Sequence, residues 1–228
     1  MTKNYHLLIY AVSYLLFFMM LLLSKARQAN RLLDEKGAVS NRGMLLLLHS
    51  AGILLLGAFS FYFFDQPLHE IVWGKNPPGD LQVLVSVFFV ITALLIVPVL
   101  AEKKMSGMKV NRSMTRSFSI GFITNYFFVR VLFLCVYEIW FRGYLLTDCI
   151  SSWNIPVAIF INIVLYVLLH SVNGKEEMRG CVPFGLLLCG LCIWTGAAWP
   201  AIALHIALAV SYEAHLVKRI NKPSIFII

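Results

Sequence analysis

The stretch 81-LQVLVSVFFVITALLIVPVLA-101 decides the fold class, because its 21 residues include no aspartate, glutamate, lysine or arginine. An α-helix needs about 20 apolar residues to cross the hydrocarbon core of a bilayer. Other apolar runs along the chain are also too long for membrane barrel strands, which span about ten alternating residues. We therefore predict an all-α polytopic membrane helix bundle with about seven transmembrane helices. The predicted spans are approximately 5–24, 43–64, 80–101, 119–147, 154–171, 181–198 and 199–217.

The composition of the 228-residue chain agrees with this prediction. It is 60% hydrophobic and only 13% charged, whereas soluble domains are about a quarter charged. The net charge of +8 is concentrated in short segments between or after the apolar runs. No basic face carries interleaved aromatic side chains, so we expect no nucleic-acid partner. Membrane lipid is the expected surrounding of the chain.

The placement of lysine and arginine predicts the orientation in the membrane, since cytoplasmic loops carry an excess of both. Fifteen of the nineteen basic residues lie in alternate segments. These segments are 25–42, 102–118, 172–180 and the tail after residue 217. We therefore predict a multi-pass protein of a bacterial-type plasma membrane, with the N-terminus outside and the C-terminus in the cytoplasm.

A few ionisable residues lie inside the predicted spans, where each costs a few kcal/mol to insert and usually faces the bundle interior. They are His49, Arg130, Glu138, Arg142, His170, His205 and Glu213. Glu138 precedes Arg142 by four residues, the favourable order for a helical ion pair. A self-contained ion pair would explain these two residues alone. The histidines at 170 and 205, on two further helices, favour a polar site where three helices converge.

Counting residues along the helices gives different depths for these groups. At 1.5 Å per residue, Glu138 lies about 16 Å from a helix end near Cys149, and His205 about 9 Å from the start of its own span. His170 lies about 24 Å from the start of its span. Convergence of all three therefore requires strong helix tilts or a fifth helix that starts higher in the membrane.

Three segments, in this order, resemble the motifs of the CPBP family, which includes type II CAAX prenyl endopeptidases and Abi proteins of bacteriocin processing and immunity. The segment 137-YEIWFR-142, followed by Gly143, resembles Glu-Glu-x-x-x-Arg. The segment 166-YVLLH-170 resembles Phe-x-x-x-His, and 205-HIALA-209 resembles His-x-x-x-Asn. The expected organisation is residues 1–118 with three helices and a basic cytoplasmic segment, 119–217 with the motif-bearing helices, and 218–228 as a cytoplasmic tail.

The resemblance implies a catalytic site made of Glu138, Arg142, His170 and His205. In this hypothesis Glu138 and His170 activate water, Arg142 orients Glu138, and His205 stabilises the oxyanion or binds a metal. A divalent metal such as zinc, held by His170, His205 and Glu138, fits the usual choice of two histidines and one carboxylate. The chain has no helical H-E-x-x-H motif, which marks conventional zinc proteases.

Two positions depart from the family pattern. Tyr137 replaces the first glutamate, and a tyrosine phenol does not deprotonate water at neutral pH. Ala209 replaces the asparagine and has no donor for an oxyanion. Adjacent helical residues point about 100° apart, so Glu138 cannot take the place of Tyr137 without rotation of the helix.

These departures leave two main functions open. The first is an intramembrane endopeptidase that hydrolyses peptide bonds of membrane-associated or lipidated peptides, its substrate partners. The second is a catalytically inactive relative that acts in peptide binding, maturation or bacteriocin immunity. A small transporter or channel subunit is a third interpretation, and it is disfavoured because the sequence lacks paired Gly/Pro-interrupted spans.

Overall fold

The computed structural model describes residues 2–27, 29–32, 41–106 and 118–221. These residues form helices and connecting turns, and no strand occurs among them. The elements are α1 (Thr2–Ala26), α2 (Arg42–Gly52), η1 (Ile53–Phe59), α3 (Ser60–Phe63), α4 (Leu68–Trp73), α5 (Asp80–Ser106), α6 (Ile120–Glu138), η2 (Ile139–Leu145), α7 (Leu146–Ser152), α8 (Ile155–His170), η3 (Ser171–Asn173), α9 (Lys175–Thr195) and α10 (Trp199–Asn221). Of these, η1 and η2 are π-helical and η3 is a 3₁₀ turn.

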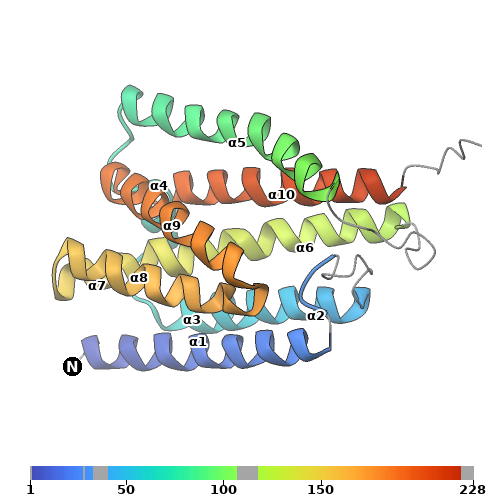
Figure 1. Cartoon of the computed structure of the whole chain (residues 1–228). Helices are drawn as coiled ribbons and strands as arrows, with labels where there is room; N and C mark the ends of the chain where they lie inside the picture. The colour runs from blue at the N-terminus through green and yellow to red at the C-terminus, as the bar shows by residue number, and fades with distance from the viewer. Residues whose placement is uncertain (1, 28, 33–40, 107–117, 222–228) are drawn as a thin grey trace, which may run out of the picture.

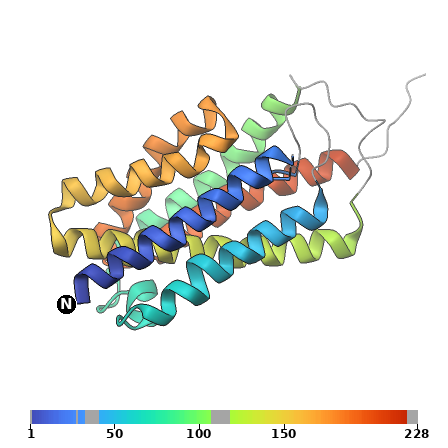
Figure 2. The ribbon, with the colours of Figure 1, turned by 90° about the horizontal axis from the view of Figure 1, so that it is seen from below.

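Seven helical stretches of the described chain are long and apolar enough to cross a membrane, which confirms the predicted polytopic bundle. They pack side by side along one long axis (Figures 1 and 2). The stretches are Tyr5–Ala26, Arg42–Phe63, Asp80–Lys104, Ile120–Ser152, Ile155–Asn173, Lys175–Thr195 and Trp199–Asn221. Their bounds follow the predicted spans closely, with one exception at the sixth.

The sixth span begins at Lys175, whereas the sequence predicted a loop over 172–180 and a span over 181–198. The chain turns sharply at Gly174, whose φ of 104° lies in the region that favours glycine. Glu176 and Glu177 then occupy the first helical turn, where negative charge suits the helix dipole. The loop prediction was therefore wrong here, because a polar helix start resembles a loop in sequence. Parts of the other three basic segments, 33–40, 107–117 and 222–228, lie outside the described residues.

The fourth span is a single long helix interrupted by the π-helical turn η2. A π-turn disturbs the regular backbone bonding and often marks a functional site. The fully buried Asn162 of α8 donates from Nδ2 to the Phe141 carbonyl oxygen of this turn at 2.6 Å. Gly143 follows, and a Cβ at this position would overlap the side chain of Ile71 in α4. The π-helical turn is thus held by the Asn162 hydrogen bond and by the close packing of Gly143 against Ile71.

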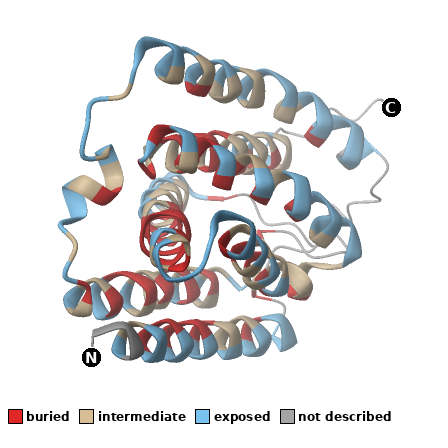
Figure 3. Ribbon diagram, turned by 90° about the vertical axis from the view of Figure 1, so that its left-hand side faces the viewer, coloured by how far each residue is buried: buried red, intermediate tan, exposed pale blue. Residues whose placement is uncertain are grey.

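Cross-helix hydrogen bonds tie α1 to the centre of the bundle. Trp140 of η2 is fully buried and donates from Nε1 to the Ser13 hydroxyl at 3.2 Å. Tyr14 donates to the Leu165 carbonyl oxygen of α8 at 2.9 Å. Viewed along the bundle, buried residues gather on the helix faces that point inward, whereas α5 is mostly exposed (Figure 3). Because α5 is strongly apolar, its exposed surface suits contact with lipid.

Candidate functional site

The predicted site residues Glu138 and Arg142 meet a third partner, His205, in the bundle interior. Arg142 Nη1 lies 3.2 Å from Glu138 Oε2, and both side chains are fully buried. His205 Nδ1, from α10, lies 2.5 Å from Glu138 Oε1. The buried carboxylate is therefore compensated by a guanidinium and an imidazole together, as a buried charge requires. The pair at 138 and 142 is not self-contained.

Aromatic rings complete the surroundings of this cluster. The Arg142 guanidinium carbon lies 4.3 Å from the centroid of the Tyr166 ring, at a distance typical of a cation–π contact. The His205 ring packs edge-on against Phe184, with centroids 5.5 Å apart, and against Tyr137 at 6.0 Å. These contacts hold the His205 ring in place while Glu138 occupies its Nδ1 atom. Its second nitrogen, Nε2, remains available to a ligand.

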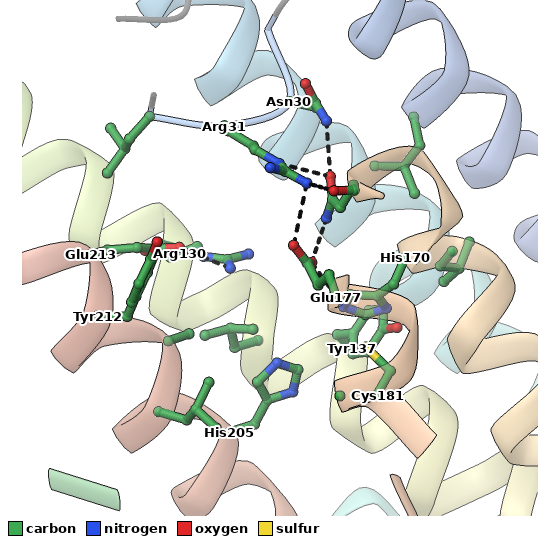
Figure 4. A pocket seen from close by; sticks show the side chains of 18 of the residues that line it. Asn30, Arg31, Arg130, Tyr137, His170, Glu177, Cys181, His205, Tyr212 and Glu213 are labelled. Carbon is green, nitrogen blue, oxygen red and sulfur yellow. Dashed lines mark hydrogen bonds and ion pairs between the residues drawn. The ribbon is translucent and has the colours of Figure 1, made fainter. Parts of the chain in front are cut away.

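A cavity of about 760 Å³ lies beside the cluster and is lined by both predicted histidines, His170 and His205. Figure 4 shows His170 in one group with Tyr137 and Glu177, and the His205 imidazole on a separate helix. The lining includes apolar residues of α1 and α6, such as Phe17 and Phe133. It also includes a group of polar residues: Asn30, Arg31, Lys104, Asn173, Lys175, Glu176 and Glu177. The cavity is thus amphipathic and can accept a ligand with polar and apolar parts.

His170 reaches the cavity from the end of α8. Its Nδ1 lies 2.9 Å from the Tyr166 carbonyl oxygen, which can only accept, so Nδ1 carries a hydrogen and donates. The other nitrogen, Nε2, lies 3.9 Å from Glu177 Oε1 of α9. That separation is too long for a direct hydrogen bond. In the neutral ring, Nε2 therefore offers a lone pair to the cavity.

Tyr137 and Glu138 are neighbours in sequence but face different surroundings. Tyr137 lines the cavity, and among the described residues its hydroxyl group has no hydrogen-bond partner. Glu138 is not part of the cavity lining and has no exposed surface. This separation agrees with the expected 100° between adjacent helical residues. Ala209, the second departure from the family pattern, also lines the cavity.

A second polar cluster forms the wall between α2, α6 and α10. Arg130 Nε donates to Glu213 Oε1 at 3.0 Å, and Arg130 Nη1 donates to His49 Nε2 at 3.1 Å. His49 donates in turn from Nδ1 to the Leu45 carbonyl oxygen at 2.8 Å. All the polar residues predicted inside spans are therefore placed in two clusters or at His170. The Arg130 cluster is internally paired and shapes the cavity wall.

The predicted metal ligands do not form a metal site. Among the residues that the structure describes, no group of three or more His, Cys, Asp or Glu side chains is arranged to hold a metal ion. Glu138 and His205 bond one another, whereas His170 is bonded at Tyr166 and faces Glu177. The described residues therefore do not fit a three-ligand metal centre.

Comparison with known families bears on the motif-bearing helices. A family model described as Type II CAAX prenyl endopeptidase Rce1-like matches residues 118–211. This part of the chain is similar to the Rce1-like family. The Rce1-like region includes Glu138, Arg142, His170 and His205, and so confirms the resemblance inferred from the three motifs. Searches of curated proteins and of solved structures find no significant match to the chain.

Glu177 was not predicted as a site residue, although it lies inside the Rce1-like region and lines the cavity. It follows His170 by only seven residues, a spacing that one tight turn can bring together. The loop predicted over 172–180 concealed this signal, because a solvated loop gives no fixed position to a side chain.

Proposed function

We propose that this protein is an intramembrane endopeptidase that hydrolyses peptide bonds of membrane-associated or lipidated peptides. One observation carries the proposal. His205, held by the buried Glu138–Arg142 pair, lines the same amphipathic cavity as His170. The match to the Rce1-like family model, whose description names prenyl endopeptidases, supports the same reaction. The cavity volume of about 760 Å³ suits a short peptide segment.

We assign His170 to the attacking water. Its Nε2 lone pair accepts a hydrogen bond from the water and directs the water oxygen toward the carbonyl carbon of the scissile bond. A C–O bond forms, the C–N bond breaks, and the proton removed from water reaches the departing amine nitrogen. This arrangement needs no contribution from Glu138, which does not line the cavity.

His205 stabilises the oxyanion in this proposal. When its ring is protonated, Nε2–H donates to the negative oxygen of the tetrahedral intermediate, while Nδ1–H donates to Glu138. Glu138 is therefore a positioning residue for His205, and Arg142 fixes Glu138 in turn. The role of Glu138 differs from the water activation expected from the motif, because its carboxylate is buried and bonded.

A catalytically inactive relative is the second candidate, favoured by Tyr137 and Ala209. Both residues line the cavity at positions where the family pattern has a glutamate and an asparagine. An inactive protein would keep the cavity for peptide binding, for example in maturation or bacteriocin immunity. It would bind the same peptides without cutting them.

One experiment separates these candidates. The purified wild-type protein in liposomes is incubated with farnesylated CAAX peptides, and mass spectrometry measures the fragments. We expect cleavage by the wild type, at a rate raised by at most about tenfold in the Tyr137→Glu/Ala209→Asn double variant, since an added base contributes only where none acts already. Cleavage by the double variant alone would show that the natural protein is inactive.

We propose the orientation that the basic residues favour, with the C-terminus in the cytoplasm. The ends of α5 and α10 carry Lys103, Lys104, Lys218 and Arg219, and both lie at the same end of the bundle (Figure 1). A fluorescent protein fused after residue 228 is expected to fluoresce in a bacterial host, whereas alkaline phosphatase fused there is expected to stay inactive. An active phosphatase would reverse the assignment.

A further inference from the structure

Glu177 is the carboxylate that lies beside His170 at the wall of the cavity. It lies in the first turn of α9, and its Oε1 is 3.9 Å from His170 Nε2. The turn at Gly174, with φ of 104°, brings the start of α9 back beside the end of α8. Figure 4 shows Glu177, His170 and Tyr137 grouped at one wall of the cavity. The family pattern has a glutamate at the position of Tyr137. In this chain the carboxylate at this wall is that of Glu177, which comes from α9.

The two facing groups are both acceptors. His170 Nδ1 donates to the Tyr166 carbonyl oxygen, so Nε2 of the neutral ring has only a lone pair. The Glu177 carboxylate also accepts only. At 3.9 Å the two atoms do not bond directly, and a water molecule that donates one hydrogen to each satisfies both. This is the geometry of a water poised for deprotonation.

Other side chains hold the Glu177 carboxylate in this position. Asn173 donates from Nδ2 to Oε1 at 2.6 Å, and Arg31 Nη2 lies 3.3 Å from Oε2. Arg31 also donates to the carbonyl oxygen and side-chain oxygen of Asn173, and Asn30 donates to that same side-chain oxygen at 2.9 Å. Figure 4 shows these bonds as one connected network. The residues after α1 thus orient a carboxylate on α9.

We propose that Glu177 is the general base of the peptidase, in place of the glutamate that position 137 lacks. The inference rests on the proposed function. His170 holds the water, and Glu177 takes one of its protons as the water oxygen bonds to the carbonyl carbon. The C–N bond then breaks, and Glu177 delivers this proton to the amine nitrogen of the leaving fragment. The carboxylate ends ionised, as it began.

The test compares Glu177→Gln with Asp80→Asn in full-length protein in liposomes, using a farnesylated CAAX peptide. Asp80 is the matched control, because it is also a carboxylate in the first turn of a long apolar helix but lies outside the cavity lining. Removing a general base lowers the rate by about 10²–10⁴-fold, so Glu177→Gln is expected to lower kcat by at least about 100-fold with little change in KM. Asp80→Asn is expected to keep kcat within about twofold.

Size-exclusion chromatography and thermal unfolding show whether Glu177→Gln is folded. If it is not, Glu177→Asp carries the test, since it retains the carboxylate but withdraws it by one methylene. It is expected to lose about tenfold in kcat, while the control Asp80→Glu loses none. Equal kcat for wild type and a folded Glu177→Gln variant would overturn the role of Glu177 and leave the proposed function standing. A wild type that cleaves no peptide would overturn the proposed function itself, and this role with it.

Discussion

Replacing His205 by alanine is expected to lower peptide cleavage by about 10²–10³-fold, the loss typical of a missing oxyanion donor. His205 lines the cavity and is oriented by Glu138 through the 2.5 Å contact at Nδ1. His170→Ala is expected to lose at least about 100-fold, because the water loses its acceptor. Fragments are measured by mass spectrometry from protein in liposomes.

The matched control for both variants is His69→Ala. His69 lies in α4 and is exposed outside the cavity, so its replacement is expected to leave cleavage unchanged. Extraction of each variant from the membrane fraction establishes that insertion is normal. If His170→Ala and His205→Ala both cleave at the wild-type rate, these histidines do not form the active site.

Arg142→Met is expected to destabilise the protein by about 3–5 kcal/mol, because it leaves the Glu138 carboxylate buried without its cation. Arg142 and Glu138 are fully buried and 3.2 Å apart, so no solvent compensates the loss. Methionine retains much of the arginine volume, which limits the effect of a cavity. The free energy of unfolding is measured in mixed micelles with increasing denaturing detergent.

A double variant separates charge from packing. Glu138→Gln/Arg142→Met removes both charges and is expected to recover most of the lost stability. Arg179→Met, at an exposed position in α9, is the single-site control and is expected to change stability by less than about 0.5 kcal/mol. Equal stability of Arg142→Met and wild type would show that the pair does not hold the bundle together.

The sequence predicted which ionisable residues lie inside the spans, but not which of them contact one another. The spacing of Glu138 and Arg142 predicted their ion pair, which the structure contains. Depth counting placed Glu138 and His205 several ångströms apart, yet their side chains touch. Depth along a helix axis ignores the tilt of each helix and the reach of a side chain. Only the packed bundle brings α10 against the end of α6.

The position of Glu177 beside His170 was not predicted from the sequence. Its sequence surroundings, 174-GKEEMRG-180, are those of a polar connection, and the loop prediction followed from them. In the structure the connection consists only of η3 and Gly174, and α9 begins at Lys175. The backbone conformation of Gly174 therefore places the Glu177 carboxylate beside His170 instead of in a solvated loop.

The sequence by itself determined the membrane class, the approximate spans and the family resemblance of residues 118–211. A helix in lipid satisfies its backbone groups internally, so apolar length alone reveals each span. The tertiary structure decided which groups meet: Glu138 with His205, Arg130 with Glu213, and His170 with Glu177. Such contacts depend on the rotation and tilt of separate helices, which side-chain packing sets and which no single span encodes.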